Sequence, residues 1–151
     1  IINLEKLYMS IKKLKLKLED PKKYYTLSHQ LGIPQISTKD LQEKIFGLEC
    51  NFEELNGIDF KKGCYVGQEN TARMKLKNKI RKRLIPIETK NKMESGSEIT
   101  FEKENIGKVI IGGEYPFALI KFGDHEKNYI GKDLDCNGLK IKLIKPVWLN
   151  N

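Results

Sequence analysis

The residues with the most scope for chemistry surround one cysteine, Cys64. Gly63 precedes it directly and Gly67 follows three residues later, so the backbone is able to turn sharply on both sides and to approach a ligand closely. Lys61 and Lys62 come just before this cysteine, and a helix is predicted to start just after it. Positive charge and a helix N-terminus both favour the thiolate over the thiol. The sequence therefore predicts a reactive thiol on a bent loop.

The same stretch also allows a purely structural interpretation, which the residues alone leave open. A free cysteine is most often a small buried hydrophobic residue, and the two glycines would then only shape a connection. Gln68 and Glu69 either orient a ligand amide or favour the start of a helix. The candidate site consists of Lys62, Cys64, Tyr65, Gln68 and Glu69, with Cys64 as the candidate metal ligand.

The other sulfur and imidazole groups offer no second site. Cys50 and Cys136 lie far from Cys64 in the sequence and form no CxxC pair, which argues against a disulfide framework and a self-contained zinc site. His29 and His125 show no HxxxH or HxxE spacing, so a metal role is not expected for them. Free thiols suit a reducing compartment, and the N-terminus shows no secretory leader, so we predict a cytoplasmic protein.

The net charge of +8 raises the possibility of a nucleic-acid partner. Residues 1–83 carry 18 Lys and Arg against 10 Asp and Glu, whereas residues 84–151 are balanced at ten each. Seven of the eleven residues from Arg73 to Arg83 are basic, so an RNA-binding module is one alternative function. Most of the basic residues are lysine, and this stretch lacks aromatic residues that could stack on bases. Direct nucleic-acid binding is therefore not expected.

The first half of the chain reads as helices. Apolar residues at helical spacing predict a helix over residues 4–14, and an alternating run predicts a strand over Leu14–Glu19. Asp20-Pro21 interrupts the chain, and a second helix is predicted through Tyr24 and Tyr25, which would anchor it to the core. Gly32-Ile33-Pro34 is a typical helix stop.

The second half reads as a small antiparallel β-barrel or sandwich. The expected strands are Leu84–Glu88, Glu98–Glu102, Lys108–Ile111, Phe117–Phe122 and Leu139–Lys145. We place the domain boundary near residue 83, which gives an α+β chain with domains at 1–83 and 84–151. Trp148 is expected to close the barrel. No window approaches the roughly 18 to 20 apolar residues of a membrane-spanning helix, so no membrane association is expected.

Residues 62–69 read KGCYVGQE and resemble the KGCYxGQE signature of the YgfZ-type proteins, a branch of the superfamily that includes the glycine-cleavage aminomethyltransferase. Four flanking stretches resemble the family's LGIP, LEAN, ELNG and TARM segments: Leu31–Pro34, Leu48-Glu49 with Asn51, Glu54–Gly57 and Thr71–Met74. The resemblance runs most clearly from Tyr25 to Pro86. Cys64 favours the YgfZ branch, because the glycine-cleavage branch resembles YVGQE without the cysteine.

The resemblance implies the C-terminal part of an aminomethyltransferase-like, tetrahydrofolate-binding fold, followed by the barrel. It also implies an accessory factor, rather than a classical enzyme, that assists iron-sulfur cluster assembly or repair and thereby tRNA modification. Cys64 would contact iron or a cluster shared transiently with an assembly protein or a client enzyme, since one thiolate cannot hold a cluster alone. Lys62, Tyr65, Gln68 and Glu69 would shape the loop.

A second hypothesis within the resemblance keeps one-carbon chemistry, with folate beside the loop and Glu69 or Asp59 assisting proton transfer. Two departures from the family bear on it. Ser28 stands where members usually carry Arg, and Asp20-Pro21 leads almost directly to Tyr24 where members have a further subdomain. The resemblance thus implies that much of the folate pocket lies outside this chain.

Overall fold

A computed structural model describes residues 3–17, 19–63, 66–77, 80–122 and 129–150 of the chain. The helices are α1 (Leu4–Lys13), α2 (Pro21–Gln30), the 3-10 helix η1 (Thr38–Leu41), α3 (Gln68–Leu76) and the 3-10 helix η3 (Val147–Asn150). The strands are β1 (Lys82–Glu88), β2 (Glu98–Phe101), β3 (Glu104–Ile111), β4 (Phe117–Lys121), β5 (Leu134–Cys136) and β6 (Leu139–Leu143). The prediction of an α+β chain with a C-terminal barrel is confirmed.

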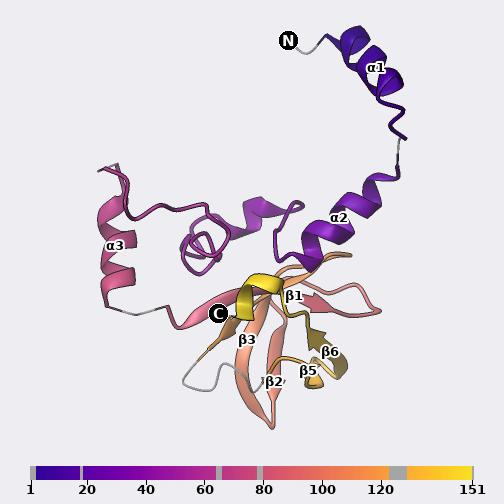
Figure 1. Ribbon diagram of the computed structural model, residues 1–151. Helices are drawn as coiled ribbons and strands as arrows, with labels where there is room; N and C mark the ends of the chain where they lie inside the picture. The colour runs from indigo at the N-terminus through magenta and orange to yellow at the C-terminus, as the bar shows by residue number, and fades with distance from the viewer. Residues whose placement is uncertain (1–2, 18, 64–65, 78–79, 123–128, 151) are drawn as a thin grey trace.

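Helix α1 begins at a capping side chain and lies away from the barrel (Figure 1). The Asn3 side chain accepts a hydrogen bond of 3.1 Å from the backbone N–H of Lys6, and no residue of the helix is buried. The predicted strand over Leu14–Glu19 is wrong for the described part of this range, which joins no sheet. Lys15 adopts a left-handed φ of 54°, which ends the helix and interrupts the extended pattern that alternation would need.

Helix α2 confirms the second predicted helix, and both of its ends follow from local chemistry. Asp20 accepts from the backbone N–H of Lys22 at 2.9 Å, and proline occupies the first helical turn. At the other end Gly32 has a φ of 74°, and its N–H donates to the His29 carbonyl at 2.9 Å. Ile33 N–H donates to the Ser28 carbonyl at 2.8 Å, which completes a Schellman motif.

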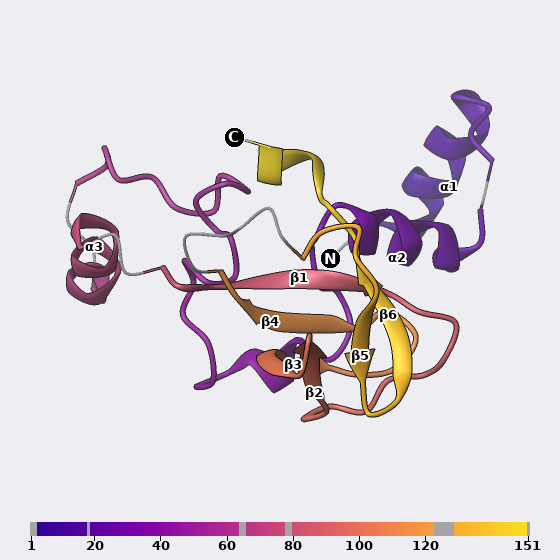
Figure 2. The ribbon, with the colours of Figure 1, turned by 90° about the horizontal axis from the view of Figure 1, so that it is seen from below.

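The six strands close into an antiparallel barrel in the order β1-β4-β3-β2-β5-β6 (Figure 2). Strand β1 closes it by pairing with β4 along its first part and with β6 at Ile87 and Glu88. Gly107 allows the close approach of β3 and β4, because a Cβ there would lie 2.4 Å from the Leu119 carbonyl oxygen. The sequence did not predict strand β5, because an alternating pattern over only three residues is too short to indicate a strand.

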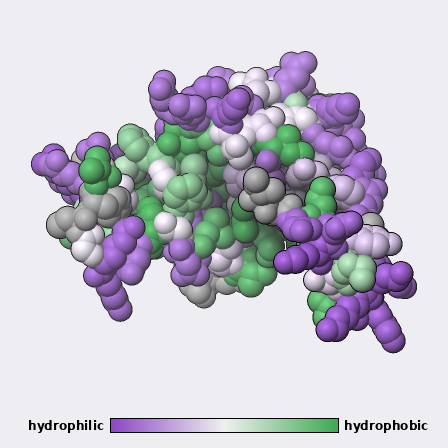
Figure 3. Space-filling view, turned by 90° about the horizontal axis from the view of Figure 1, so that it is seen from above, coloured by the Kyte–Doolittle hydropathy of each residue, from purple (hydrophilic) through white to green (hydrophobic). Residues whose placement is uncertain are grey.

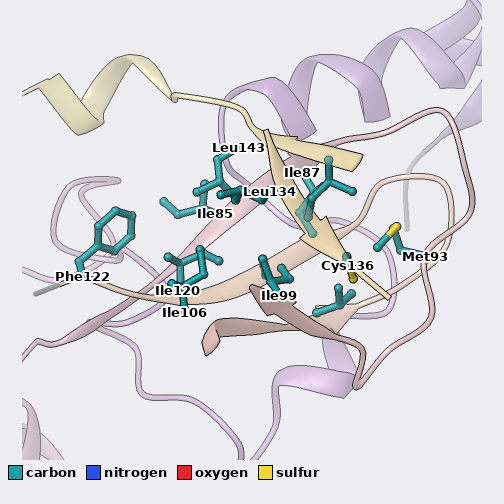
Figure 4. Packing of buried hydrophobic residues seen from close by; sticks show 13 residues of the cluster. Ile85, Ile87, Met93, Ile99, Ile106, Ile120, Phe122, Leu134, Cys136 and Leu143 are labelled. Carbon is teal, nitrogen blue, oxygen red and sulfur yellow. The ribbon is translucent and has the colours of Figure 1, made fainter. Parts of the chain in front are cut away.

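The barrel interior is filled by aliphatic side chains, as Figure 4 shows. Ile85 and Ile87 on β1 point inward together with Ile99, Ile120 and Leu134 from other strands, each almost completely buried. Burying one such side chain stabilises the fold by about 1.5–3 kcal/mol before entropy is counted. Alternation along β1 therefore sets which residues form the core.

The opposite face of β1 is also buried, because the preceding segment packs on it. Leu84 belongs to a second cluster with Phe117 and Leu119, and Cys50 covers this cluster from the segment before the barrel. A backbone hydrogen bond also joins this segment to β1, since the Leu84 N–H donates to the Glu49 carbonyl at 2.8 Å. The helical half thus contacts the barrel directly, and the division into domains at residue 83 stays a prediction.

The C-terminal residues return to the helical side. Trp148 packs against the barrel core, and its indole N–H donates to the Leu31 carbonyl at 2.8 Å. A Cβ on Gly32 would lie 2.9 Å from the Trp148 ring, so the glycine leaves room for it. Among the described residues, no helix has both the length and the apolar composition that a membrane crossing requires.

Candidate functional site

Two of the five candidate site residues, Cys64 and Tyr65, lie outside the residues that the structure describes. The residues on either side of them, Gly63 and Val66, are exposed. Lys62 is exposed as well, and Gln68 is half-buried at the start of α3. The described part of the loop therefore lies at the surface of the molecule, while the position of the thiol stays a prediction.

The helix predicted to follow the motif is present as α3. Gly67 precedes it in a left-handed conformation with a φ of 86°, and a Cβ there would meet no atom within 4 Å. The glycine is needed for the backbone angle rather than for space. Glu69 lies in the first helical turn and forms an exposed ion pair of 2.5 Å with Arg73 one turn later. The Glu69 carboxylate is thus paired within α3.

The loop is entered from a tight turn over residues 51–57. Asn51, completely buried with a φ of 63°, donates from its side chain to the Leu84 carbonyl at 2.8 Å. The N–H groups of Gly57 and Ile58 both donate to the Phe52 carbonyl, which fixes where the loop leaves the turn. The LEAN-like and ELNG-like segments seen in the sequence therefore join the loop to strand β1.

Two ion pairs hold this turn from opposite sides. Glu54 pairs with Arg83 of β1 at 2.5 Å, and both side chains are largely shielded from solvent. Glu53 pairs with Lys75 of α3 at 2.6 Å. The turn is thereby connected both to the barrel and to the helix that follows the loop. Spacing in the sequence gave no sign of these pairs, because their members lie 22 and 29 residues apart.

The two described cysteines are held as thiols. Burial, together with the charge of Glu49, raises the pKa of Cys50 to about 11. Burial, together with the charge of Asp135, raises the pKa of Cys136, and a hydrogen bond with Ser97 opposes this. Neither group is a thiolate near neutral pH, so neither competes with Cys64 for the predicted chemistry. The described residues contain no group of three or more potential metal-binding side chains.

His29 is a buried residue of α2. Its Nε2 lies 2.9 Å from the Pro116 carbonyl oxygen, and its ring meets Phe117 and Tyr115 edge to face. Burial lowers the pKa of His29, and the hydrogen bond to Pro116 opposes part of that effect. A neutral imidazole that donates to a carbonyl is a structural group here. His125 lies outside the described residues.

A cavity of about 530 Å³ is lined by the segment that follows α2, by η1 and by the turn over residues 51–57. Apolar residues form most of its wall, among them Ile33, Leu41, Ile45, Phe52 and Leu55. Figure 3 views the helical side and shows hydrophobic side chains gathered in the middle of that face. All of the polar and charged side chains that line the cavity are exposed: Thr38, Lys39, Gln42 and Glu43.

These residues do not fit tetrahydrofolate. A pterin ring carries several hydrogen-bonding groups, and a binding site orients such a ring with a few buried polar partners. The described cavity offers no buried polar side chain for that purpose. We therefore derive no chemical step through folate, and the predicted folate site stays untested.

Comparison with known proteins shows a similarity between the barrel and a described family of domains. Residues 81–151 match the family model described as CAF17, C-terminal beta-barrel domain. The match begins one residue before β1 and covers every strand of the barrel.

Three relatives of the chain are all named as iron-sulfur cluster assembly factors. Over 63 residues the chain is 44% identical to the iron-sulfur cluster assembly factor IBA57 homolog, mitochondrial, of Neurospora crassa, covering 42% of this chain and 14% of the relative. It is 53% identical over 57 residues to the Dictyostelium discoideum homolog, covering 37% and 14%. It is 44% identical over 71 residues to the Mus musculus factor, covering 46% and 20%. The matched segments thus span a fifth or less of these relatives.

The relatives contradict the predicted cytoplasmic location, since all three are described as mitochondrial. The physical argument behind that prediction was too coarse, because free thiols persist in any reducing compartment. The resemblance noted in the sequence is supported at a coarser level than its YgfZ branch: the chain is similar to iron-sulfur cluster assembly factors, and its last 71 residues are similar to the CAF17 C-terminal β-barrel domain.

Proposed function

We propose that this chain acts in iron-sulfur cluster assembly, in a mitochondrial compartment. The observation that carries the proposal is its similarity, at 44% and 53% identity, to proteins named as iron-sulfur cluster assembly factors. The matching segments are short relative to those proteins, so the activity of a complete assembly factor is part of the proposal.

Cys64 is the group that we propose contacts the cluster. It is the cysteine of the KGCYVGQE motif, and the described residues on both sides of it are exposed. Cys50 and Cys136 are buried thiols and do not suit the role. Lys62 and the nearby N-terminus of α3 would favour the thiolate, which is the form that binds iron.

The remaining ligands would come from a partner. Iron-sulfur clusters are usually held by about four ligands, and the described residues contain no group of three or more candidates. The cluster is then a substrate that is shared during transfer, with Cys64 occupying one position. A partner that presents two or three thiolates, as an assembly protein or a client enzyme, fits this chemistry.

Replacement of Cys64 tests the proposal. We expect Cys64→Ser to abolish transfer of a cluster from a loaded assembly protein to an apo client, measured by the visible absorbance of the client cluster and by its activity. The matched control is Val66→Ser, which makes a similar polar change at an exposed position of the same loop. Full transfer by the Cys64 variant would refute the proposed role.

Folate binding and support of tRNA modification are separate expectations from the resemblance. Calorimetry and thermal shift with millimolar tetrahydrofolate test the first on this chain. Binding would support the one-carbon alternative, with Glu69 or Asp59 as the proton-transfer group. Since Glu69 is already paired with Arg73, Asp59 is the more available of the two, although its side chain accepts from the Lys61 N–H at 2.8 Å.

A further inference from the structure

One side chain, that of Lys75, connects the segments on either side of the loop that runs from Ile58 to Gly67. Lys75 lies in the last turn of α3, after the loop, and its Nζ is 2.6 Å from a carboxylate oxygen of Glu53, before the loop. The same Nζ lies 5.7 Å from the centre of the Phe60 ring, within the range of a cation–π contact. We call Lys75 and these two partners the clamp.

The clamp rests on a turn that is itself fixed to the barrel. Glu54, the neighbour of Glu53, forms the shielded ion pair with Arg83 at 2.5 Å. Asn51, at the start of the turn, donates to the Leu84 carbonyl from a completely buried position. The entrance of the loop is therefore held in a fixed relation to β1, and the clamp extends this relation to α3.

The described residues of the loop, 58–63 and 66–67, run between the two segments that the clamp joins. None of these residues pairs in a strand and only Ile58 and Phe60 are half-buried, and a surface loop of about ten residues with free ends would sample many arrangements. The clamp restricts the range of positions that α3 can take relative to the turn. An accurately placed thiol transfers a shared ligand faster than a loosely held one, because less conformational freedom is lost when the complex forms.

We propose that Lys75 is a positioning residue for the loop, acting through Glu53 and Phe60 to orient Cys64 toward a cluster-bearing partner. This inference rests on the proposed function. Exposed ion pairs contribute little to global stability, so the effect falls on the loop and on transfer rather than on folding.

Hydrogen exchange of the full chain tests the clamp itself. Lys75→Glu and Glu53→Lys should each raise amide exchange over residues 58–67 by about two- to fivefold, and leave the barrel amides unchanged. The double swap Glu53→Lys with Lys75→Glu should recover most of the protection. The matched control is Lys23→Glu, which breaks the exposed pair between Lys23 of α2 and Glu19 just before the helix. Unchanged exchange in both single variants would overturn the proposal.

Cluster transfer tests the positioning role. The two single variants shift the net charge in opposite directions, whereas both break the clamp. We expect both to slow transfer by about two- to fivefold, and the swap, which keeps the native net charge, to restore it. If the two variants change the transfer rate in opposite directions, or if the swap does not restore it, the positioning role of Lys75 is wrong. Net charge would then account for the effect on transfer.

The two proposals fail in different ways. If Cys64→Ser has no effect on transfer, the proposed role of Cys64 is wrong, and the positioning role falls with it even where exchange responds as expected. If Cys64→Ser abolishes transfer and the Lys75 variants transfer at the native rate, the function stands and the positioning role is wrong.

Discussion

At the scale of single residues, the two cysteines that the structure describes share one environment. Cys50 and Cys136 are buried, and burial raises the pKa of both thiols, that of Cys50 to about 11. Cys64 is flanked by exposed residues. The cysteine count alone did not separate them, because all three are unpaired in the sequence.

This difference predicts selective labelling. With iodoacetamide at pH 7.5, Cys64 should alkylate at least about tenfold faster than Cys50, because thiolate is the reacting form and burial blocks access. Mass spectrometry of peptides from the folded protein measures both rates. Labelling of Cys50 should rise only as the pH approaches its pKa of about 11. Equal rates at pH 7.5 in the folded protein would contradict the assignment.

Asn51 is the residue whose loss should cost most in the turn before the loop. Asn51→Ala removes a buried hydrogen bond to the Leu84 carbonyl and places alanine at a φ of 63°. We expect a loss of about 2–3 kcal/mol in the free energy of unfolding, measured with urea. Asn51→Gly is the control, since glycine accepts this φ, and the difference between the two variants isolates backbone strain. A loss below about 0.5 kcal/mol in both would be inconsistent with the structure.

At the scale of elements, helix α2 docks on the barrel through His29. Its ring lies among Tyr25, Tyr115 and Phe117, and none of the described residues that line the small hollow around it is a carboxylate. Burial lowers the pKa of His29 below its ordinary value of 6.5. The neutral imidazole therefore favours docking of α2 on the barrel, whereas the protonated ring disfavours it.

The pH dependence of stability follows from this sign. Since the unfolded chain binds the proton more readily than the folded one, the contribution of His29 is complete above about pH 6.5. It is lost as the pH falls through the lower folded-state pKa. Urea midpoints between pH 7.5 and 4.5 should fall less in His29→Gln, which keeps a donor for the Pro116 carbonyl. An identical fall in both proteins would argue against a buried neutral histidine.

At the scale of the whole molecule, stability is concentrated in the barrel and in the segment packed on its outer face. Helix α1 buries none of its residues, and it lies away from the barrel in both ribbon views (Figures 1 and 2). A ten-residue helix without tertiary contacts is marginal in water.

Removal of residues 1–19 should therefore leave the barrel nearly unchanged. We expect the free energy of unfolding to change by less than about 0.5 kcal/mol, measured by urea denaturation followed at Trp148 fluorescence. Deletion through residue 36 is the comparison, because it also removes His29 and the Leu31 carbonyl that bonds to Trp148. A large loss on removing only the first 19 residues would show that α1 is packed.

The sequence by itself determined the features that depend on neighbouring residues. Asp20-Pro21 and Gly32 set the ends of α2 through local caps, and the run of β-favouring residues from Leu84 to Glu88 marked strand β1. Gly67 before Gln68 marked the start of α3. Each of these signals acts within a few residues, so spacing and residue type were enough.

Only the tertiary structure decided the features that depend on distant parts of the chain. The strand expected over Leu14–Glu19 has no described neighbour to pair with, and β5 forms because β2 and β6 flank it. The pairing of Glu54 with Arg83, and of Glu53 with Lys75, likewise follows from folding the turn against β1 and α3. Such contacts arise from closing the barrel and packing the chain around it, which no local pattern encodes.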